Sequence, residues 1–458
     1  MRFALKMAVA IVSFSVKSGP EKRAAEGTVH GFERRKGEKM QEFRRRPYWG
    51  WYVVLGAFLV MGINYGTRYS FGVFVQPMAL DHGWSRSVVS AGMSVMVLAY
   101  GIGCIFAGRL IDRIAPRWII TAGAALMTAG LFLTALVREP WQFYVSYGVF
   151  GGLGAACLGV VVCNSSVGKW FVRKRGFAIG LSSIGVGVGT MAMTPLAGYV
   201  VKVYGWEAGF LCLGTIVLVV GVLLSQWLMG KTRPEDYGLQ PDGEEGETAD
   251  LAPLSAGDPT GKPSLGPVLV DSHFWILAVC FSLAVMAEMS VMVHQVAYAL
   301  DRNIDKVAAA SSLGMTGMSS ILGRFFFGWL SDRLRDAKHA AALGFLLMAA
   351  GMFLLLKVTS SATLFVYALI FGFGYGSISV MMPCLLAERF GRRILGTSYG
   401  MLTFFVAGIG GGLGPLVTGI LYDLSGAYNH AWLLNLFFLL LVTFLILRLK
   451  PRRTDRVG

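Results

Sequence analysis

Charged residues are scarce in this sequence. Asp, Glu, Lys and Arg account for 15% of its 458 residues, while hydrophobic residues account for 55%. Soluble domains carry about 25% charged residues, and a mean hydropathy of +0.60 is too apolar for a soluble protein of this length. The composition therefore excludes a soluble protein and predicts a chain that crosses a membrane many times.

Acidic residues are the rarer charged class, with 26 Asp and Glu against 41 Lys and Arg and a formal net charge of +15. The basic residues form short clusters between apolar runs, without one continuous patch in which aromatic residues are interleaved. A nucleic-acid interface requires such a patch, so we expect no nucleic-acid partner. An excess of Lys and Arg in loops is what membrane orientation predicts.

Several chemical signatures are missing. No glycine-rich loop leads into Lys and Ser or Thr, so nucleotide-driven transport is not expected. No cluster of His, Cys and acidic residues stands at a membrane face, so we expect neither an enzyme nor a cofactor nor a metal. The cysteines lie in apolar runs without metal-type or redox-type spacing: Cys104, Cys157, Cys163, Cys212, Cys280 and Cys384.

Long apolar segments follow one another from Trp49 onward. A helix needs about 20 predominantly apolar residues to cross a bilayer, and these segments are of about that length. We therefore predict an all-α membrane protein with twelve transmembrane helices. The predicted spans lie at roughly 49–75, 87–110, 117–137, 141–166, 176–201, 206–229, 273–299, 307–330, 339–357, 363–387, 395–421 and 429–448.

The predicted spans form two groups of six. Residues 230–271 separate the groups, are rich in Pro, Gly, Glu and Asp, and lack apolar periodicity, so we expect a linker there. The N-terminal half is then 47–229, and the C-terminal half is 272–448. Residues 1–46 form a basic extension that we expect to be disordered, and residues 449–458 form a basic tail.

Lys and Arg are distributed unevenly between the two sides of the membrane. The extension, the tail and the alternate loops that include the linker hold 33 of the 41, and the opposite loops hold 6. The remaining two, Arg68 and Arg324, lie inside spans. Because cytoplasmic loops carry the Lys and Arg excess, both termini and the linker are predicted to be cytoplasmic, with the chain in the cell (inner or plasma) membrane.

One six-helix unit occurs twice in the same orientation. Residues 220 positions apart match repeatedly between the halves, which is typical of carriers that rock two halves about a site at the membrane midplane. The matching pairs are Gly108 and Gly328, Asp112 and Asp332, Arg113 and Arg333, Gly176 and Gly396, Gly180 and Gly400, and Pro195 and Pro415.

The loop after the second predicted span reads G-R-L-I-D-R-I-A-P-R from Gly108, and its repeat reads G-W-L-S-D-R-L from Gly328. The pattern resembles the signature of the major facilitator superfamily and implies that superfamily's fold. It also implies a cytoplasmic gate held closed by charge networks. The gate residues would be Asp112, Arg113, Asp332 and Arg333. Membrane-edge charges that only obey the orientation rule are the plainer alternative.

Two further stretches narrow the resemblance. Y-W-G-W-Y-V-V-L-G-A-F (Tyr48–Phe58) looks like the opening motif of monocarboxylate transporters, and W-F-V-R-K-R-G-F-A-I-G-L-S-S-I-G (Trp170–Gly185) resembles their second motif. Gly323 with Arg324, and F-G-F-G-Y-G from Phe371, extend the likeness over nearly all twelve spans. Bacterial oxalate/formate exchangers share much of this outline.

The resemblance implies a secondary active transporter of small monocarboxylates, such as lactate or pyruvate, that works by alternating access in symport with a proton. One alternative is an organic-anion exchanger of the oxalate/formate type. Another, of a different class, is a membrane sensor or receptor that does not transport. The expected partners are a small carboxylate anion, a proton and the lipid bilayer, and we expect a monomer.

Arg324 lies inside the otherwise uncharged predicted span 307–330. A guanidinium stays protonated at membrane depth and costs at least about 2.5 to 3.5 kcal/mol there, so it normally faces water or a counter-charge. The resemblance implies that Arg324 takes the place of the family arginine that binds the substrate carboxylate. Its planar fork suits that role, since it can donate two parallel hydrogen bonds to a carboxylate.

The sequence departs from the family pattern in several places. Arg46 and Pro47 stand where the first motif opens with an acidic residue, and Tyr69 replaces the span-1 lysine of the animal carriers. Ser320 replaces the aspartate one turn before the span-8 arginine, which is a proton partner in that family. Val406 stands where oxalate exchangers carry a second cation, which argues against a dianion site of that type.

Glu288 is the only acidic residue well inside a predicted span, and it occupies the position that matches Arg68 in the repeat. A carboxylate near arginines can exchange a proton when substrate arrives, and a histidine titrates near neutral pH. We therefore hypothesise that Glu288 or His294 carries the coupled proton, with Arg68 as a counter-charge or second anion contact. A structural salt bridge between Arg68 and Glu288 is the alternative.

Polar and aromatic residues in other predicted spans are expected to complete the substrate site around Arg324. Intramembrane tyrosine and asparagine often form hydrogen bonds between helices instead. The residues are Tyr65, Tyr69, Asn164 and Tyr375.

Overall fold

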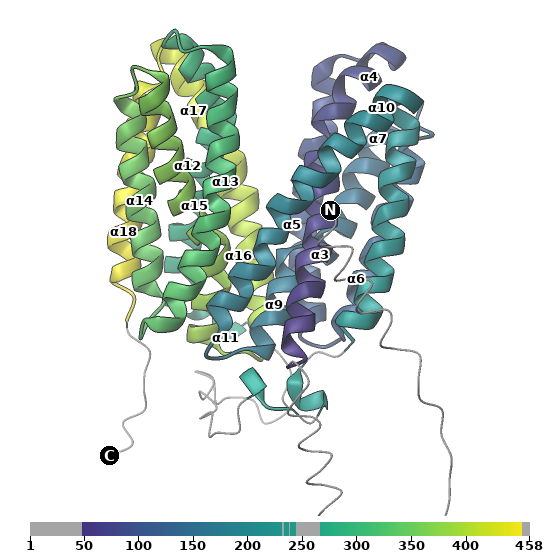
Figure 1. Ribbon diagram of the computed structural model, residues 1–458, viewed down its shortest axis with the longest axis vertical. Coiled ribbons are helices and arrows are strands. Elements are labelled where there is room, and N and C mark those ends of the chain that lie inside the picture. The colour runs from purple at the N-terminus through teal and green to yellow at the C-terminus, as the bar shows by residue number, and fades with distance from the viewer. Residues whose placement is uncertain (1–47, 231–232, 238, 244–265, 451–458) are drawn as a thin grey trace, which may run out of the picture. The chain divides into compact units, whose positions relative to one another are not determined.

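The computed structural model describes residues 48–230, 233–237, 239–243 and 266–450. The predicted extension 1–46 lies outside these residues, as do much of the predicted linker and most of the predicted tail. All regular elements among the described residues are helices, and Figure 1 shows them coloured from purple to yellow along the chain.

The N-terminal half begins several helices at favourable capping residues. Ser85 accepts a hydrogen bond from the backbone N–H of Val88 at the start of α5, and Pro116 and Pro140 open α6 and α7 because their rings preset a helical φ. The elements are α3 (Gly50–Tyr69), α4 (Gly72–His82), α5 (Arg86–Ile111), α6 (Pro116–Thr134), α7 (Pro140–Phe143), the π-helical η1 (Tyr144–Phe150), α8 (Gly151–Cys157), α9 (Val160–Trp170) and α10 (Arg175–Leu228).

The C-terminal half is built in the same way, with Asp305 and Ser360 capping α13 and α15. Its elements are α12 (Ser272–Asp301), α13 (Lys306–Arg333), α14 (Lys338–Leu356), α15 (Ser361–Phe390), α16 (Leu395–Thr403), the π-helical η4 (Phe404–Gly410), α17 (Gly411–Ser425) and α18 (Asn429–Leu447). The described parts of the linker contain η2 (Pro234–Tyr237), η3 (Pro241–Gly243) and α11 (Gly266–Val270).

Ten helical stretches in the described part of the chain are long and apolar enough to cross a membrane. Nine of them each match one predicted span. The tenth, α10, carries the fifth and sixth predicted spans, which Gly205 divides with a φ of 91°. The eighth predicted span coincides with α13, which has 28 residues but is less apolar. The chain is therefore a multi-pass membrane protein, while the count of twelve spans stays a prediction.

Many large apolar side chains are exposed on the outer faces of the helices. The exposed fraction is 53% for Leu433 and 59% for Phe437, both on α18. Burying one such side chain away from water is worth about 1.5 to 3 kcal/mol, so surfaces of this kind suit lipid rather than water.

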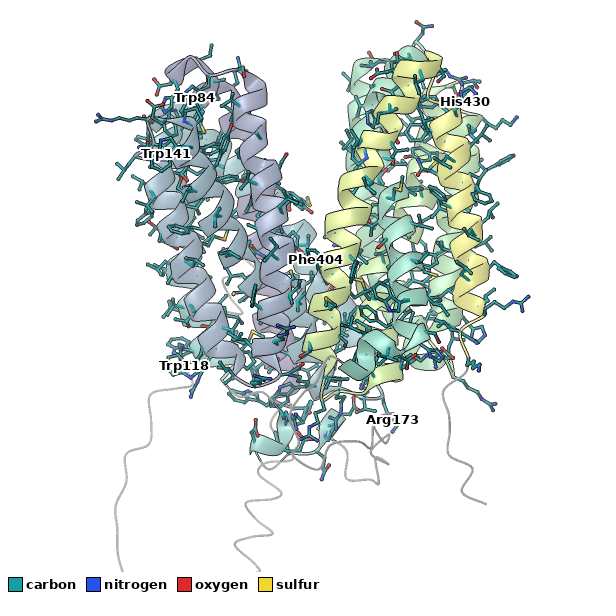
Figure 2. All side chains as sticks on the ribbon, turned by 180° about the vertical axis from the view of Figure 1, so that it is seen from behind. Trp84, Trp118, Trp141, Arg173, Phe404 and His430 are labelled. Carbon is teal, nitrogen blue, oxygen red and sulfur yellow. The ribbon has the colours of Figure 1, made fainter. Side chains whose placement is uncertain are left out.

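Labelled side chains mark the two ends of the N-terminal half. Trp118 and Arg173 lie at one end of its helices, and Trp84 and Trp141 lie at the other (Figure 2). Because the backbone N–H of Arg173 contacts Asp242 of the linker, we call the first of these the linker end.

Glycines allow the two halves to touch at the linker end. α5 crosses α16 where Gly108 faces Gly396, and α10 crosses α13 where Gly176 faces Gly328. A methyl group on any of these glycines would overlap the facing backbone, so small residues are what permit the close approach. Because the two crossings are related by the internal repeat, the same contact is made twice.

Candidate functional site

Arg324 lies on α13 with 5% of its surface exposed. Its Nη1 donates to the carbonyl oxygen of Ser183 on α10 at 3.1 Å, and its Nη2 donates to the Tyr375 hydroxyl on α15 at 3.3 Å. Its Nε has no hydrogen-bond partner among the described residues. A buried donor without a partner costs about 1 to 3 kcal/mol, so an oxygen ligand at this nitrogen would recover that cost.

The F-G-F-G-Y-G motif of α15 explains how this arrangement forms. The residue after Tyr375 is Gly376, and a methyl group on it would overlap the α13 backbone at Ser320 and Arg324. Because this position is glycine, α15 packs directly against α13 and brings the Tyr375 hydroxyl to the guanidinium. On the opposite side, Gly180 of α10 allows an equally close approach to the Arg324 carbonyl.

Glu288 on α12 is buried beside this pair, with 5% of its surface exposed. Its carboxylate interacts electrostatically with Arg324 and with the Tyr375 hydroxyl. The described salt bridges do not include a direct Glu288–Arg324 pair. Among the described residues, Arg324 therefore has no directly paired carboxylate, and its Nε has no hydrogen-bond partner.

Tyr69 ends α3 and brings the N-terminal half to the same region. Half of its surface is exposed, and its hydroxyl interacts electrostatically with Arg68, Glu288 and Arg324. Its ring lies 5.7 Å from that of Tyr65. Of the predicted site residues, the structure thus brings Arg324, Tyr375, Glu288 and Tyr69 together, with Tyr65 and Arg68 alongside Tyr69.

Arg68 does not form the salt bridge with Glu288 that we considered as an alternative. Its guanidinium carbon lies 4.3 Å from the ring centroid of Tyr100 and 5.2 Å from that of Tyr65. The two tyrosine hydroxyls lie 3.1 Å apart and are hydrogen-bonded to each other. Aromatic faces, rather than a carboxylate, therefore surround this arginine.

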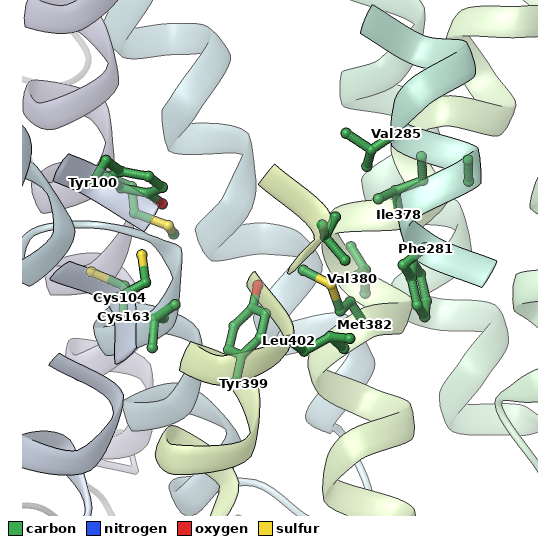
Figure 3. Close-up of a cluster of buried hydrophobic side chains, with 14 of the residues drawn as sticks. Tyr100, Cys104, Cys163, Phe281, Val285, Ile378, Val380, Met382, Tyr399 and Leu402 are labelled. Carbon is green, nitrogen blue, oxygen red and sulfur yellow. The ribbon is translucent and has the colours of Figure 1, made fainter. Parts of the chain in front are cut away.

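His294 and Asn164 have other partners. The His294 Nε2 lies 3.1 Å from the carbonyl oxygen of Pro415 and its Nδ1 lies 3.4 Å from the Tyr428 hydroxyl, both within the C-terminal half. Asn164 donates to the Tyr399 hydroxyl at 3.4 Å and so links α9 to α16. Figure 3 shows Tyr399 at this junction, among buried side chains of both halves.

The repeated loop aspartates connect the two halves at the linker end. The Asp112 carboxylate accepts hydrogen bonds from the backbone N–H groups of Gly396 and Thr397 at 3.1 and 2.7 Å. The Asp332 carboxylate accepts from those of Gly176 and Phe177 at 2.6 and 2.8 Å. Each aspartate thus caps a helix of the opposite half, where the helix dipole favours negative charge.

The predicted arginines of the gate lie outside this network. Arg113 and Arg333 are exposed at their helix ends, and the Arg333 guanidinium stacks on Trp329 at 4.3 Å. The cation beside Asp112 is instead Lys169, which is 1% exposed and pairs with it at 2.8 Å. Sequence reasoning missed Lys169, although another basic residue, Arg389, stands at the matching position of the repeat, and that match was a usable signal.

The described part of the linker also contacts the gate. Asp242 accepts hydrogen bonds from the backbone N–H groups of three consecutive residues before α10, Val172, Arg173 and Lys174, at 2.8, 2.8 and 3.2 Å. Glu235 pairs at 3.5 Å with Arg392 of the C-terminal half. The linker therefore contacts a loop of each half.

Comparisons of the sequence with known proteins agree with this architecture. The profile of the Major Facilitator Superfamily matches residues 57–407 and 319–457. Monocarboxylate transporter 13 of Rattus norvegicus is 25% identical over 393 residues, which cover 86% of this chain and 87% of the relative. Monocarboxylate transporter 12 of Rattus norvegicus is 27% identical over 429 residues, with 87% and 85% covered. Monocarboxylate transporter 2 of Homo sapiens is 25% identical, with 84% and 82% covered.

Solved structures share the fold. The E. coli fucose:proton symporter FucP superposes with a TM-score of 0.64, at 16% identity and covering 86% of this chain and 98% of that one. The human organic anion transporter MFSD10 gives a TM-score of 0.66, at 16% identity with 88% and 100% covered. The profile match spans most of the sequence and the helices follow the same fold, so the chain belongs to the major facilitator superfamily.

Proposed function

We propose that the protein is a secondary active transporter of small monocarboxylates of the lactate or pyruvate type, coupled to a proton. The observation that carries the proposal is the buried Arg324, whose Nε is unpartnered while its other nitrogens contact helices of both halves. A planar guanidinium with a donor to spare suits a carboxylate. The named monocarboxylate transporters aligned over more than four fifths of the chain support the same substrate class.

In this mechanism, Arg324 binds the substrate carboxylate and Glu288 takes up the proton. An incoming anion neutralises the guanidinium that otherwise stabilises the ionised Glu288, so the carboxyl group gains a proton as the substrate binds. The Tyr375 hydroxyl accepts a hydrogen bond from Arg324 and interacts electrostatically with Glu288, so it can respond to the charge of both groups. We prefer Glu288 to His294 because His294 is engaged with Pro415 and Tyr428.

Alternating access requires the linker end to open and close. We propose that two six-helix halves, 47–229 and 272–448, move against each other, and that the Asp112 and Asp332 caps hold the closed state. We further propose twelve crossings, a cytoplasmic linker with both termini on the same side, and a monomer in the cell membrane. The uneven Lys and Arg distribution supports this orientation.

Counterflow in proteoliposomes tests the proposal. Wild-type protein should exchange labelled lactate for unlabelled lactate, and an acidic exterior should drive net uptake. Arg324→Gln should lower uptake about a hundredfold or more, because it removes charge-assisted hydrogen bonds worth about 1.5 to 3 kcal/mol each. Arg302→Gln is the matched control, since Arg302 also stacks on a tyrosine but lies at the end of α12. Full uptake by Arg324→Gln would refute the site, and exchange without any response to the proton gradient would favour the organic-anion exchanger.

A further inference from the structure

Ser183 of α10 carries a buried hydroxyl close to Arg324 that the proposed mechanism does not use. The backbone carbonyl oxygen of Ser183 accepts the hydrogen bond from the Arg324 Nη1 at 3.1 Å. The residue is 1% exposed, and its hydroxyl has no hydrogen-bond partner among the described residues. Burying a hydroxyl without a partner is unfavourable. Ser183 therefore has both a donor and an acceptor to offer to a ligand.

The neighbouring serine shows that the helix does not force this state. A serine inside a helix can donate to the carbonyl oxygen three or four residues earlier, and the Ser182 hydroxyl donates in this way to Ile179 at 2.9 Å. It also donates to the Oδ1 of Asn164 on α9 at 3.5 Å. The hydroxyls of two consecutive residues thus differ, because the protein satisfies the first and leaves the second free.

Helix periodicity places Ser183 on the face of α10 that meets α13. Successive residues of a helix are rotated by about 100°, so positions 180, 183 and 187 fall within about 60° of one another. A methyl group on Gly180 would overlap the Arg324 backbone, and one on Gly187 would contact the Ile321 side chain. The Ser183 side chain therefore leaves α10 toward the helix that carries Arg324.

A short acid with an oxygen on carbon 2 can reach from the guanidinium to this hydroxyl. Four covalent bonds join a serine hydroxyl to its own carbonyl oxygen, so the two atoms lie within about 5 Å of each other. The Ser183 Oγ is then within about 8 Å of the Arg324 Nη1. In lactate or pyruvate the carboxylate and the 2-oxygen are about 3 Å apart, and each hydrogen bond adds about 2.8 to 2.9 Å. One molecule can therefore contact both groups.

We propose that Ser183 is a specificity-determining residue, which binds the oxygen on carbon 2 of the substrate while Arg324 binds its carboxylate. A serine hydroxyl both donates and accepts, so it suits the 2-hydroxyl of lactate as well as the 2-keto oxygen of pyruvate. The site would thus select 2-hydroxy and 2-oxo monocarboxylates over unsubstituted ones such as propionate. The inference rests on the proposed function, because it uses the same Arg324 contact.

Lactate and propionate differ only in the oxygen on carbon 2, so the ratio of their affinities reports this contact. Calorimetry with the full chain in lipid nanodiscs measures the binding of each acid and of 3-hydroxypropionate, in which the hydroxyl is moved by one carbon. Wild-type protein should bind lactate about threefold to tenfold more tightly than the other two acids. Ser183→Ala should remove this preference by weakening lactate alone, and Ser183→Thr, which keeps a hydroxyl, should retain part of it.

Ser182→Ala is the matched control, because the Ser182 hydroxyl already has partners within the protein. It should leave the ratio of lactate to propionate affinity unchanged. Arg324→Gln should weaken lactate and propionate by the same factor, since both acids carry the carboxylate. The ratio within one variant does not depend on how much of that variant is folded, so a loss of folded protein cannot imitate the expected result.

An unchanged ratio in Ser183→Ala would overturn the inference, as would an equal change in Ser182→Ala or a wild type that binds lactate and propionate equally well. Each of these results leaves the proposed function standing. A wild type that binds neither acid would refute the proposed function and the inference together. A preference that depends on Ser183, in a protein that binds lactate but does not move it in proteoliposomes, would support the inference and refute the proposed transport.

Discussion

The two halves share their aspartate caps at the linker end but not their buried charges. The aspartate of each repeated loop caps a helix of the opposite half, and the glycine crossings repeat with it. By contrast, the repeat matches Arg324 with Cys104, and it matches Glu288 with Arg68. The contacts that close the linker end are therefore duplicated, while the groups proposed to hold an anion and a proton are not. In the proposed mechanism, the repeated contacts serve the movement of the halves and the unrepeated charges serve binding.

The gate itself is not fully symmetric. Asp112 combines its cap with a buried ion pair to Lys169. In the C-terminal half, the matching basic residue is Arg389, which pairs at 2.6 Å with Asp336 and not with Asp332. The N-terminal gate aspartate is thus tied to a buried cation, whereas the other one depends mainly on backbone N–H groups.

The largest effect on stability is expected from removing the charge of Asp112, the aspartate that pairs with Lys169. Asp112→Asn should lower the free energy of unfolding by about 3 to 5 kcal/mol, because Lys169 would stay buried without its counter-charge. Asp332→Asn should cost about 1.5 to 3 kcal/mol, since it weakens charge-assisted bonds to backbone N–H groups. Denaturation of the purified variants followed by tryptophan fluorescence measures both. Adding Lys169→Met to Asp112→Asn should restore part of the loss, and equal losses in the two single variants would contradict the asymmetry.

A glycine pair on α13 tests the crossing itself. Gly328→Ala should destabilise the closed linker end by about 1 to 3 kcal/mol, because the added methyl group overlaps α10. Gly317→Ala on the same helix has open space around it and should leave the closed state unchanged. Lactate uptake and protease access at the linker end report the effect. The crossing would lose its assigned role if the two variants behaved alike.

The proposed proton role of Glu288 belongs to the C-terminal half alone, because the matching residue of the N-terminal half is Arg68. It can be tested as follows. One proton per substrate lets a pH difference of one unit, acidic outside, support about a tenfold accumulation, since one unit corresponds to about 1.36 kcal/mol. Glu288→Gln should abolish this accumulation and keep lactate counterflow. Measuring uptake at equal and unequal pH separates the two quantities. Accumulation that persists in the variant would assign the proton to another group.

The smallest effect is expected at the linker. Asp242→Ala should lower stability by about 0.5 to 2 kcal/mol, as the loss of a helix-capping carboxylate usually does. Thermal unfolding of the purified protein measures it. Asp301→Ala is the control, because Asp301 is exposed and ends α12, the helix whose other end follows the linker. Identical unfolding temperatures for Asp242→Ala and the wild type would mean that the cap contributes nothing to the gate.

The repeated loop motif singles out Asp112 and Asp332 in the sequence, and Tyr375 is expected near Arg324 as an aromatic residue with a hydroxyl inside a predicted span. It did not show which backbone groups the aspartates cap, since that depends on the contact between the two halves. The resemblance to the superfamily signature groups the arginines that follow the aspartates with them. One residue along a helix is a rotation of about 100°, however, and the arginines point outward.

Helix geometry also explains the separation of Glu288 and His294. Six residues rotate a helix by about 240° beyond a full turn, so the two side chains of α12 face different neighbours. Asn164 was grouped with the site because it is a polar residue inside a span, yet its partner is Tyr399. Burial and periodicity indicate that a polar group needs a partner, but they do not identify the partner.

Gly205 has a mechanical consequence for the N-terminal half. It is the residue with non-helical backbone angles inside α10, and its φ of 91° is one that glycine adopts without strain. Connections between neighbouring helices usually contain two to eight residues, whereas in the structure one residue separates the two helical segments of α10 that carry the fifth and sixth predicted spans. A connection of one residue allows little independent movement of the two helical segments. We therefore expect a tilt of α10 at the Gly176 crossing to move the segment after Gly205 as well. Opening of the proposed gate would then move the fifth and sixth predicted spans together.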